Sequence, residues 1–151
     1  MSHLKQDLKI AKDLKFNAFG CKLVRGAYLK AETKNFQEKL IPKFPLHQSY
    51  EDTNNSYDMA VEMLFGEMTN EKNLCVTLAT HNMDSLKRGL TLLRNNHSLK
   101  NQVNFAQING LADPVSLALS MENVQVLKLL PCGSVDEVLP WLGRYVKVIT
   151  S

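Results

Sequence analysis

The sequence predicts an α/β fold, a partial (β/α)8 TIM-type barrel of about four βα units preceded by a helix. Two observations predict it. Short apolar segments rich in β-forming residues alternate with amphipathic helical patterns, the order that gives parallel strands with right-handed crossovers. Polar residues also gather where these segments end, and a barrel places its active site at the carboxyl ends of its strands.

A leading helix is expected because Leu4, Leu8, Ala11 and Leu14 recur at helical spacing. Four strands are then expected, each an apolar run that ends at turn residues such as Gly or Pro. The strands are expected at 19–28, 74–80, 103–108 and 124–130.

Helices are expected between and after these strands. The pattern at 50–68 carries one apolar stripe, and 83–95 carries another. Asp113 before Pro114 is a good N-cap for a short helix. Ser134 and Glu137 form a capping box for a last helix at 135–146. The polar stretch at 30–49 is interpreted as an excursion between a strand and a helix.

A small doubly wound sheet is the alternative architecture. The sequence has no Gly-x-Gly-x-x-Gly after any apolar segment and no Walker loop, so half a barrel is the better fit. Half a barrel leaves two unpaired strand edges and an uncovered inner face. We therefore expect self-association through the open edges into a pseudo-barrel, binding of a complementary half, or aggregation.

Composition narrows the function classes. The 151 residues are 44% hydrophobic and 22% charged, with a formal charge of +3. The lysines are dispersed, which disfavours nucleic-acid binding. The cysteines, at 21, 75 and 132, have no metal-ligand spacing and are expected to be buried or half-buried reduced thiols; no metal site is expected. No apolar stretch is long enough to span a membrane, and the first residues show no targeting segment.

The sharpest motif is Lys22-Leu23-Val24-Arg25-Gly26-Ala27-Tyr28. We expect Lys22 and Val24 to point to opposite faces, and Gly26 to allow close backbone approach by a ligand. A lysine within an apolar barrel strand is costly unless it faces a cavity or an anion. The alternative is a strand end with solvated cations, and physical reasoning alone leaves the two about equal.

Weaker motifs follow the other strands. Thr80-His81-Asn82 offers hydrogen-bonding groups at a strand end, although a turn that caps the next helix explains it as well. Arg144 in the last helix is either surface charge or a carboxylate clamp.

Together these motifs resemble one family, the FAD-dependent proline dehydrogenases. The matching segments are KLVRGAYL, YEDTNNSYDMAVE, ATHNMDSL, FAQINGLADPVSLAL and LPCGSVDEVLPWLGR. They run from the leading helix to about Arg144, and KLVRGAY is closest to the eukaryotic branch. The resemblance implies that residues 1–151 are the C-terminal half of a (β/α)8 barrel that oxidises L-proline to 1-pyrroline-5-carboxylate.

The resemblance also implies residue roles. Catalytic roles fall to Lys22, beside the reactive edge of the flavin, and to Arg144. The implied FAD-binding residues are Val24, Arg25, Gly26, Ala27, Thr80, His81 and Asn82. Leu23, Tyr28 and Ile108 are implied to bind the substrate. A quinone as electron acceptor and a mitochondrial location are implied for the parent enzyme.

Three departures from the family pattern bear on activity. The family has four more βα units upstream that complete its site. Tyr145 replaces the second of two paired arginines, and the tail 145–151 is altered. Leu129 stands where proline-specific members carry tyrosine and hydroxyproline-specific members a smaller polar residue, so hydroxyproline is an alternative substrate. We expect little or no proline oxidation by this chain alone.

Two other functions remain open. One is a catalytically dead half-barrel remnant or binding module. The other, ranked last because no Gly-rich phosphate loop is present, is an unrelated (β/α) enzyme for a phosphorylated substrate.

Overall fold

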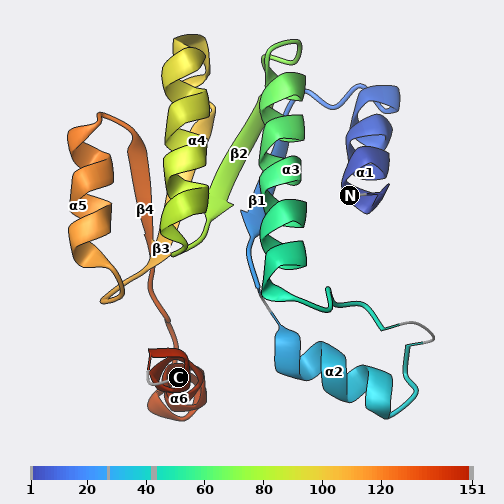
Figure 1. Ribbon diagram of the computed structural model, residues 1–151, viewed down its shortest axis with the longest axis vertical. Coiled ribbons are helices and arrows are strands. Elements are labelled where there is room, and N and C mark those ends of the chain that lie inside the picture. The colour runs from blue at the N-terminus through green and yellow to red at the C-terminus, as the bar shows by residue number, and fades with distance from the viewer. Residues whose placement is uncertain (1, 27, 42–43, 150–151) are drawn as a thin grey trace.

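Four parallel strands form one sheet in the computed structural model, which describes residues 2–26, 28–41 and 44–149. The sheet has the order β1-β2-β3-β4, so each strand pairs with the next along the chain (Figure 1). The strands are β1 (Phe19–Val24), β2 (Leu74–Ala79), β3 (Val103–Ile108) and β4 (Gln125–Leu129). Parallel strands in sequential order, joined by helices, are half of the arrangement that closes a (β/α)8 barrel.

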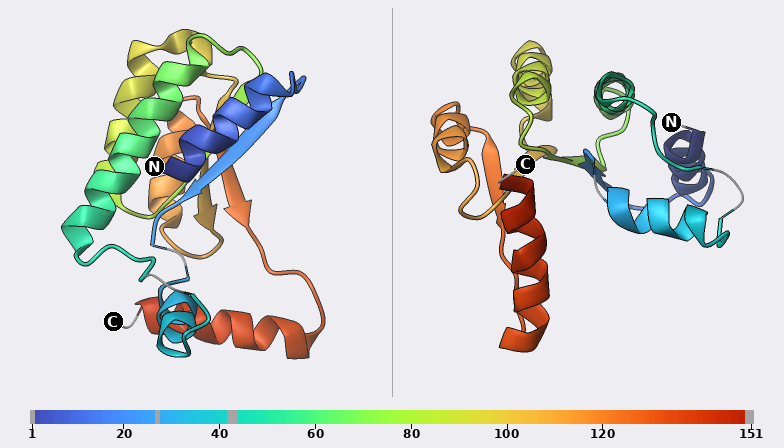
Figure 2. Two further views of the ribbon diagram at one scale, coloured as in Figure 1. Left: turned by 90° about the vertical axis from the view of Figure 1, so that its right-hand side faces the viewer. Right: turned by 60° about the horizontal axis from the view of Figure 1, so that its bottom comes forward.

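Four helices cover one face of this sheet (Figure 2). They are α1 (Ser2–Asp13), α3 (Tyr50–Met68), α4 (Met83–Asn95) and α5 (Asp113–Met121), and the 3₁₀ turn η1 (His97–Leu99) follows α4. Two further helices, α2 (Leu29–Gln37) and α6 (Val135–Ile149), lie beyond the carboxyl ends of β1 and β4 (Figure 1).

The core lies between the sheet and these four helices. Alternate residues of the central strands point into it: Val76, Val103 and Phe105 are each 0% exposed, and Leu78 is 1% exposed. The helices add apolar stripes at helical spacing, and Leu64 of α3 is 0% exposed. Burial of these two surfaces against each other is the main stabilising contribution to the fold.

The other face of the sheet is open in the described residues. The strand register aligns two rows of side chains there. One row is Lys22, Thr77, Asn104 and Gln125, and the next is Val24, Ala79, Ala106 and Leu127. In a closed barrel this face is the interior.

The structure confirms the four strands and corrects several details. β1 ends at Val24 because Gly26 and Tyr28 take left-handed backbone conformations, with φ of 70° and 62°. The stretch 30–49 is not all loop, since it holds most of α2, a helix with no buried residue. The last helix extends to Ile149. Lys22 and Val24 share the open face, since residues two apart on a strand point to the same side.

The caps are partly as predicted. Glu137 accepts a hydrogen bond from the Ser134 backbone N–H at 2.9 Å, which confirms the capping box. The N-cap of α5 is Ala112 rather than Asp113, and Asp113 instead forms an ion pair with Lys128 at 2.6 Å. Asn82 caps α4 by accepting from the Ser85 backbone N–H at 2.9 Å.

The cysteines are free, as expected, but only Cys21 is half-buried. Cys75 and Cys132 are exposed, which is a correction. Cys75 is exposed because it lies on the open face, paired in register with Gly20, whereas Cys21 packs against the core.

Candidate functional site

A lysine and three uncharged polar side chains form the first row of the open face. Lys22 is exposed there and forms no ion pair with another described residue. In the same row, the Oδ1 atom of Asn104 is buried without a hydrogen-bond partner among the described residues. Thr77 lies between Lys22 and Asn104 in this row, so the open face holds an exposed lysine and, one strand further on, a buried acceptor that the described residues leave unsatisfied.

The second row is apolar and lies nearer the carboxyl ends of the strands. Val24 is 46% exposed and Leu127 is 39% exposed, with Ala79 and Ala106 between them in register. Leu129, 41% exposed, pairs with Ile108 one row further on. The open face therefore offers an apolar patch beside the Lys22 ammonium group.

Arg25 lies at the edge of this patch and is held by α3. Its backbone N–H donates to the Ala79 carbonyl at 3.3 Å, which continues the β1–β2 pairing. Its Nη2 donates to Oδ1 of Asn54, and its guanidinium lies over the Tyr50 ring, 4.6 Å from the centroid. Its Nε is buried without a partner in the described part of the chain. The Arg25 side chain is thus held by stacking on Tyr50 and by one hydrogen bond to Asn54.

Tyr50 joins Arg25 to the start of α4. Its hydroxyl accepts a hydrogen bond from Nδ2 of Asn82 at 3.1 Å. The Arg25 guanidinium that lies over the ring, together with the hydrogen bond from Asn82, lowers the pKa of the Tyr50 phenol. Arg25, Tyr50 and Asn82 therefore form a continuous cluster at the carboxyl ends of β1 and β2.

His81 bridges β2 and β3. Its Nε2 accepts a hydrogen bond from the Ile108 backbone N–H at 3.3 Å, so the proton of the neutral ring lies on Nδ1. Burial, together with the positive charge of Lys128, lowers the pKa of the imidazole. The ring is neutral at pH 7. Its neighbour Thr80 is buried and accepts from the Asn82 backbone N–H at 3.0 Å.

Not every predicted residue joins this face. Leu23 points to the opposite side of β1 and packs against the core, so we leave it out of the proposed pocket. Tyr28 is 77% exposed, beyond the end of β1, and Gly26 lies in the turn before it. Ala27 and the side chain of Arg144 lie outside the described residues, so their predicted roles stay predictions.

Sequence reasoning missed three residues of this cluster: Tyr50, Asn54 and Asn104. Tyr50 and Asn54 lie one helical turn apart, and their spacing is visible in the sequence. Their contact with Arg25 is not visible, because it joins segments that are far apart in sequence. Gln107, a polar residue near the end of β3, is 2% exposed and bonds to Ser116 inside the core.

The donor set suits a large cofactor better than a metal ion. No group of three or more His, Cys, Asp or Glu side chains gathers within the described ranges. An arginine and a lysine beside an apolar patch, with unsatisfied buried atoms on Arg25 and Asn104, fit a group that has both an anionic part and a polar ring edge. The residues present therefore fit a flavin dinucleotide.

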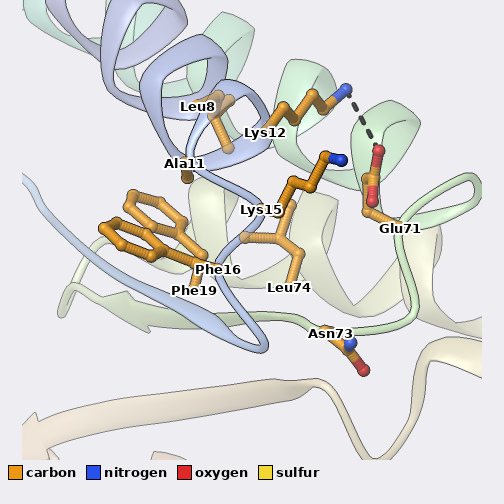
Figure 3. Close-up of a pocket in the computed structure, with 9 residues that line it drawn as sticks. All are labelled: Leu8, Ala11, Lys12, Lys15, Phe16, Phe19, Glu71, Asn73 and Leu74. Carbon is orange, nitrogen blue, oxygen red and sulfur yellow. Dashed lines mark ion pairs between the residues drawn. The ribbon is translucent and has the colours of Figure 1, made fainter.

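A pocket of about 240 Å³ lies away from this cluster, at the amino-terminal ends of β1 and β2 (Figure 3). Leu8, Phe16, Phe19 and Leu74 line it, and a Lys12–Glu71 ion pair of 3.4 Å lies at its edge (Figure 3). In α/β barrels conservation at this end serves stability rather than catalysis. We therefore assign the pocket no part in the site.

The helices show no membrane span. Among those in the part of the chain that the structure describes, none combines the length and the apolar character that crossing a bilayer requires.

Comparison with known proteins identifies the family. A family model described as proline dehydrogenase matches residues 1–147. The chain is 33% identical over 148 residues to proline dehydrogenase 1, mitochondrial, of Dictyostelium discoideum, covering 95% of this chain and 26% of that protein. It is 38% identical over 148 residues to hydroxyproline dehydrogenase of Xenopus laevis, covering 95% of this chain and 31% of that protein.

A solved structure shares the fold. It is proline utilization A from Bdellovibrio bacteriovorus, with a TM-score of 0.86 and 21% sequence identity, covering 99% of this chain and 15% of that one. The chain thus spans about a third or less of the length of these relatives. With the family model matched over nearly its whole length, the chain belongs to the proline dehydrogenase family of flavoenzymes.

Proposed function

We propose that this chain supplies one half of a barrel that oxidises L-proline to 1-pyrroline-5-carboxylate with bound FAD. The observation that carries the proposal is Lys22, which forms no ion pair with another described residue and lies on the open face of a parallel sheet, one row below an apolar patch. A solvated strand end, the competing interpretation, does not explain why Oδ1 of Asn104, in the same row of the open face, is buried without a partner among the described residues.

The residues would act as follows. Bound FAD supplies an acceptor for the hydride. L-proline would lose that hydride from its ring carbon and release a proton from its ring nitrogen to water, so that the C–N bond becomes C=N. Lys22 stabilises the negative charge that develops on the acceptor side. Val24, Ala106 and Leu127 exclude water from the reacting face, which strengthens that electrostatic effect.

The anionic part of the cofactor would be bound at the carboxyl ends of the strands. Arg25 offers its remaining guanidinium N–H groups, and His81 offers a neutral Nδ1–H. Gly26, with φ of 70°, allows close backbone approach there. The Thr80 hydroxyl already accepts from the Asn82 backbone N–H, and the Asn82 side chain already caps α4. We therefore propose that these two residues support the site without binding the cofactor directly.

Ile108 and Leu129 would form a wall of the substrate pocket, since they pair in register on the open face. Leu129 presents carbon and no hydrogen-bonding group, and a polar partner for the hydroxyl of hydroxyproline is therefore missing at that position. This favours proline as the substrate. Tyr28 would have to move inward to reach the ring, because it is 77% exposed.

The proposed site needs further strands. The described sheet has edges at β1 and β4, and its second face is uncovered, whereas a closed barrel has eight strands around this interior. We propose that the open edges bind a complementary half, and that at high concentration a second copy of the chain takes its place. By itself the chain would oxidise little or no proline.

The test compares the chain alone with the chain co-expressed with the remainder of the barrel from the Dictyostelium relative. Visible flavin absorbance and its anaerobic bleaching by L-proline are measured. We expect bleaching only in the complex, and we expect Lys22→Met to slow it by about 100-fold. Lys72→Met, an exposed lysine in the loop before β2, is the matched control.

Three outcomes contradict the proposal in different places. Bleaching by the lone chain refutes the need for a second half. A complex that bleaches normally with Lys22→Met refutes the role of Lys22. A stable complex without flavin refutes the cofactor. Faster bleaching with trans-4-hydroxy-L-proline than with L-proline would indicate hydroxyproline as the preferred substrate, as in the name of the Xenopus relative.

The same proposal includes a mitochondrial location and quinone as the electron acceptor. The location is supported by the mitochondrial designation of the Dictyostelium relative, which shares 33% of its aligned residues with this chain. Quinone as the acceptor rests on the family resemblance alone.

A further inference from the structure

Two side chains from the first turns of α3 hold Arg25 in place. Tyr50 and Asn54 are four residues apart and therefore lie on the same side of the helix. The Tyr50 ring covers one face of the guanidinium at 4.6 Å, and Asn54 Oδ1 accepts from Nη2. These two contacts leave a planar cation with one face and one nitrogen already occupied, which restricts how it can rotate.

Hydrogen bonding alone does not explain this placement. Nε of Arg25 is buried without a partner among the described residues, and such a donor costs free energy. The guanidinium would satisfy more donors by turning out to water. Stacking on Tyr50 and the Asn54 bond offset that cost, so the two α3 residues decide where the cation sits.

Tyr50 also connects the Arg25 side chain with the carboxyl end of β2. Its hydroxyl accepts from Asn82 Nδ2 at 3.1 Å, and Asn82 Oδ1 in turn caps α4. The ring is nevertheless 68% exposed, so it adds little to the core. A tyrosine that contributes little burial yet contacts residues at the ends of both β1 and β2 is better placed to orient than to stabilise.

We propose that Tyr50, assisted by Asn54, is a positioning residue that fixes the Arg25 guanidinium at the carboxyl ends of the strands to receive a diphosphate. This inference rests on the proposed function for the identity of the dinucleotide. The contacts themselves exist without any cofactor, and can be tested separately.

The first test needs only the lone chain. In ¹H–¹⁵N spectra, the Arg25 Nε–Hε signal, assigned with Arg25→Lys, is expected to be shifted by the Tyr50 ring and slow to exchange with water. Tyr50→Leu is expected to move it to the position of a free arginine, while Tyr50→Phe keeps the ring and most of the shift. Phe16→Leu, an aromatic 57% exposed at the opposite end of the sheet, is the control. An unchanged Arg25 signal in Tyr50→Leu overturns the proposal.

The second test uses inorganic pyrophosphate as the probe, again on the lone chain. We expect it to shift the Arg25 signal, with an affinity that falls about tenfold in Tyr50→Leu, less in Tyr50→Phe, and not at all in Phe16→Leu. Equal affinity in wild type and Tyr50→Leu overturns the positioning role. Neither readout involves flavin or proline. Failure of the proposed oxidation therefore does not contradict the positioning role of Tyr50, and failure of the positioning role does not contradict the proposed oxidation.

Discussion

The two faces of the same four strands differ sharply. On the helix-covered face, Val76, Val103 and Phe105 are completely buried. On the open face, Val24, Leu127 and Leu129 are between 39% and 46% exposed. The strands, backbone pairing and register are shared, so only the covering differs. The covered face determines that this sheet forms, and the open face carries the residues that imply a function.

The largest expected effect tests that division directly. Phe105→Ala should lower the free energy of unfolding by about 3–5 kcal/mol, because it leaves a cavity in the core. Leu127→Ala, on the adjacent strand β4 but on the open face, should cost below about 1 kcal/mol. Urea denaturation measures both. Equal costs would mean that the open face is covered in solution.

A second pair of variants sharpens the packing argument. A Cβ at Gly89 would lie 2.7 Å from Leu78 Cδ1 and 3.3 Å from Phe105, so Gly89→Ala should destabilise by about 1–3 kcal/mol. Gly66, in α3, has nothing within 4 Å of its Cβ position, and Gly66→Ala should stabilise by about 0.5–1 kcal/mol. Thermal unfolding distinguishes them. Stabilisation by both would contradict the close contact of α4 with β2.

Tyr57 gives a smaller effect of opposite sign. Its hydroxyl is buried without a partner within the described residues, so Tyr57→Phe should raise the free energy of unfolding by about 1 kcal/mol. Burial also raises the pKa of the phenol above its ordinary value near 10. The folded state then keeps this proton longer than the unfolded state does.

Stability should consequently fall with rising pH above about 10, and fall less in Tyr57→Phe. The measurement is urea denaturation at pH 8 and pH 11 on both proteins. Tyr50, whose pKa is lowered, acts in the opposite direction in both, so the difference isolates Tyr57. Identical slopes would show that the Tyr57 hydroxyl is hydrated.

The smallest effect concerns the ion pair near the start of α5. The hydrogen bond from Lys128 lowers the pKa of the Asp113 carboxyl. A carboxyl with a lowered folded-state pKa stabilises above its unfolded pKa, and this contribution is lost as the pH falls through the folded value. Asp113→Asn should therefore flatten acid unfolding below pH 4 slightly. Circular dichroism during acid titration checks this.

The sequence predicts the fold better than the site. Strand β3 is predicted at its observed bounds because alternate apolar residues and the Asn109-Gly110 turn define it. The α2 helix is missed because it buries no residue and so shows no core-facing stripe. A helix that packs against no core needs no apolar stripe, and the stripe is the pattern from which a helix is predicted.

The sequence predicts only those residues of the candidate site that lie within or just after an apolar run. Lys22, Arg25 and His81 are found because they follow or interrupt apolar runs. Tyr50 is missed because its role depends on a contact with Arg25 across the α2 excursion, which no local pattern encodes. Leu23 is implied to bind the substrate by the family resemblance, whereas the alternation of side chains along β1 places it against the core.

The most direct test of the open face is the alkylation rate of Cys75, followed by peptide mass spectrometry. Cys75 lies on the open face, Cys132 is exposed beyond β4, and Cys21 is half-buried with a raised thiol pKa. In dilute protein, we predict that Cys75 reacts about as fast as Cys132 and about tenfold faster than Cys21. Slowing of Cys75 alone on adding the remainder of the barrel would confirm closure over this face. A Cys75 as slow as Cys21 in the dilute lone chain would contradict an open sheet.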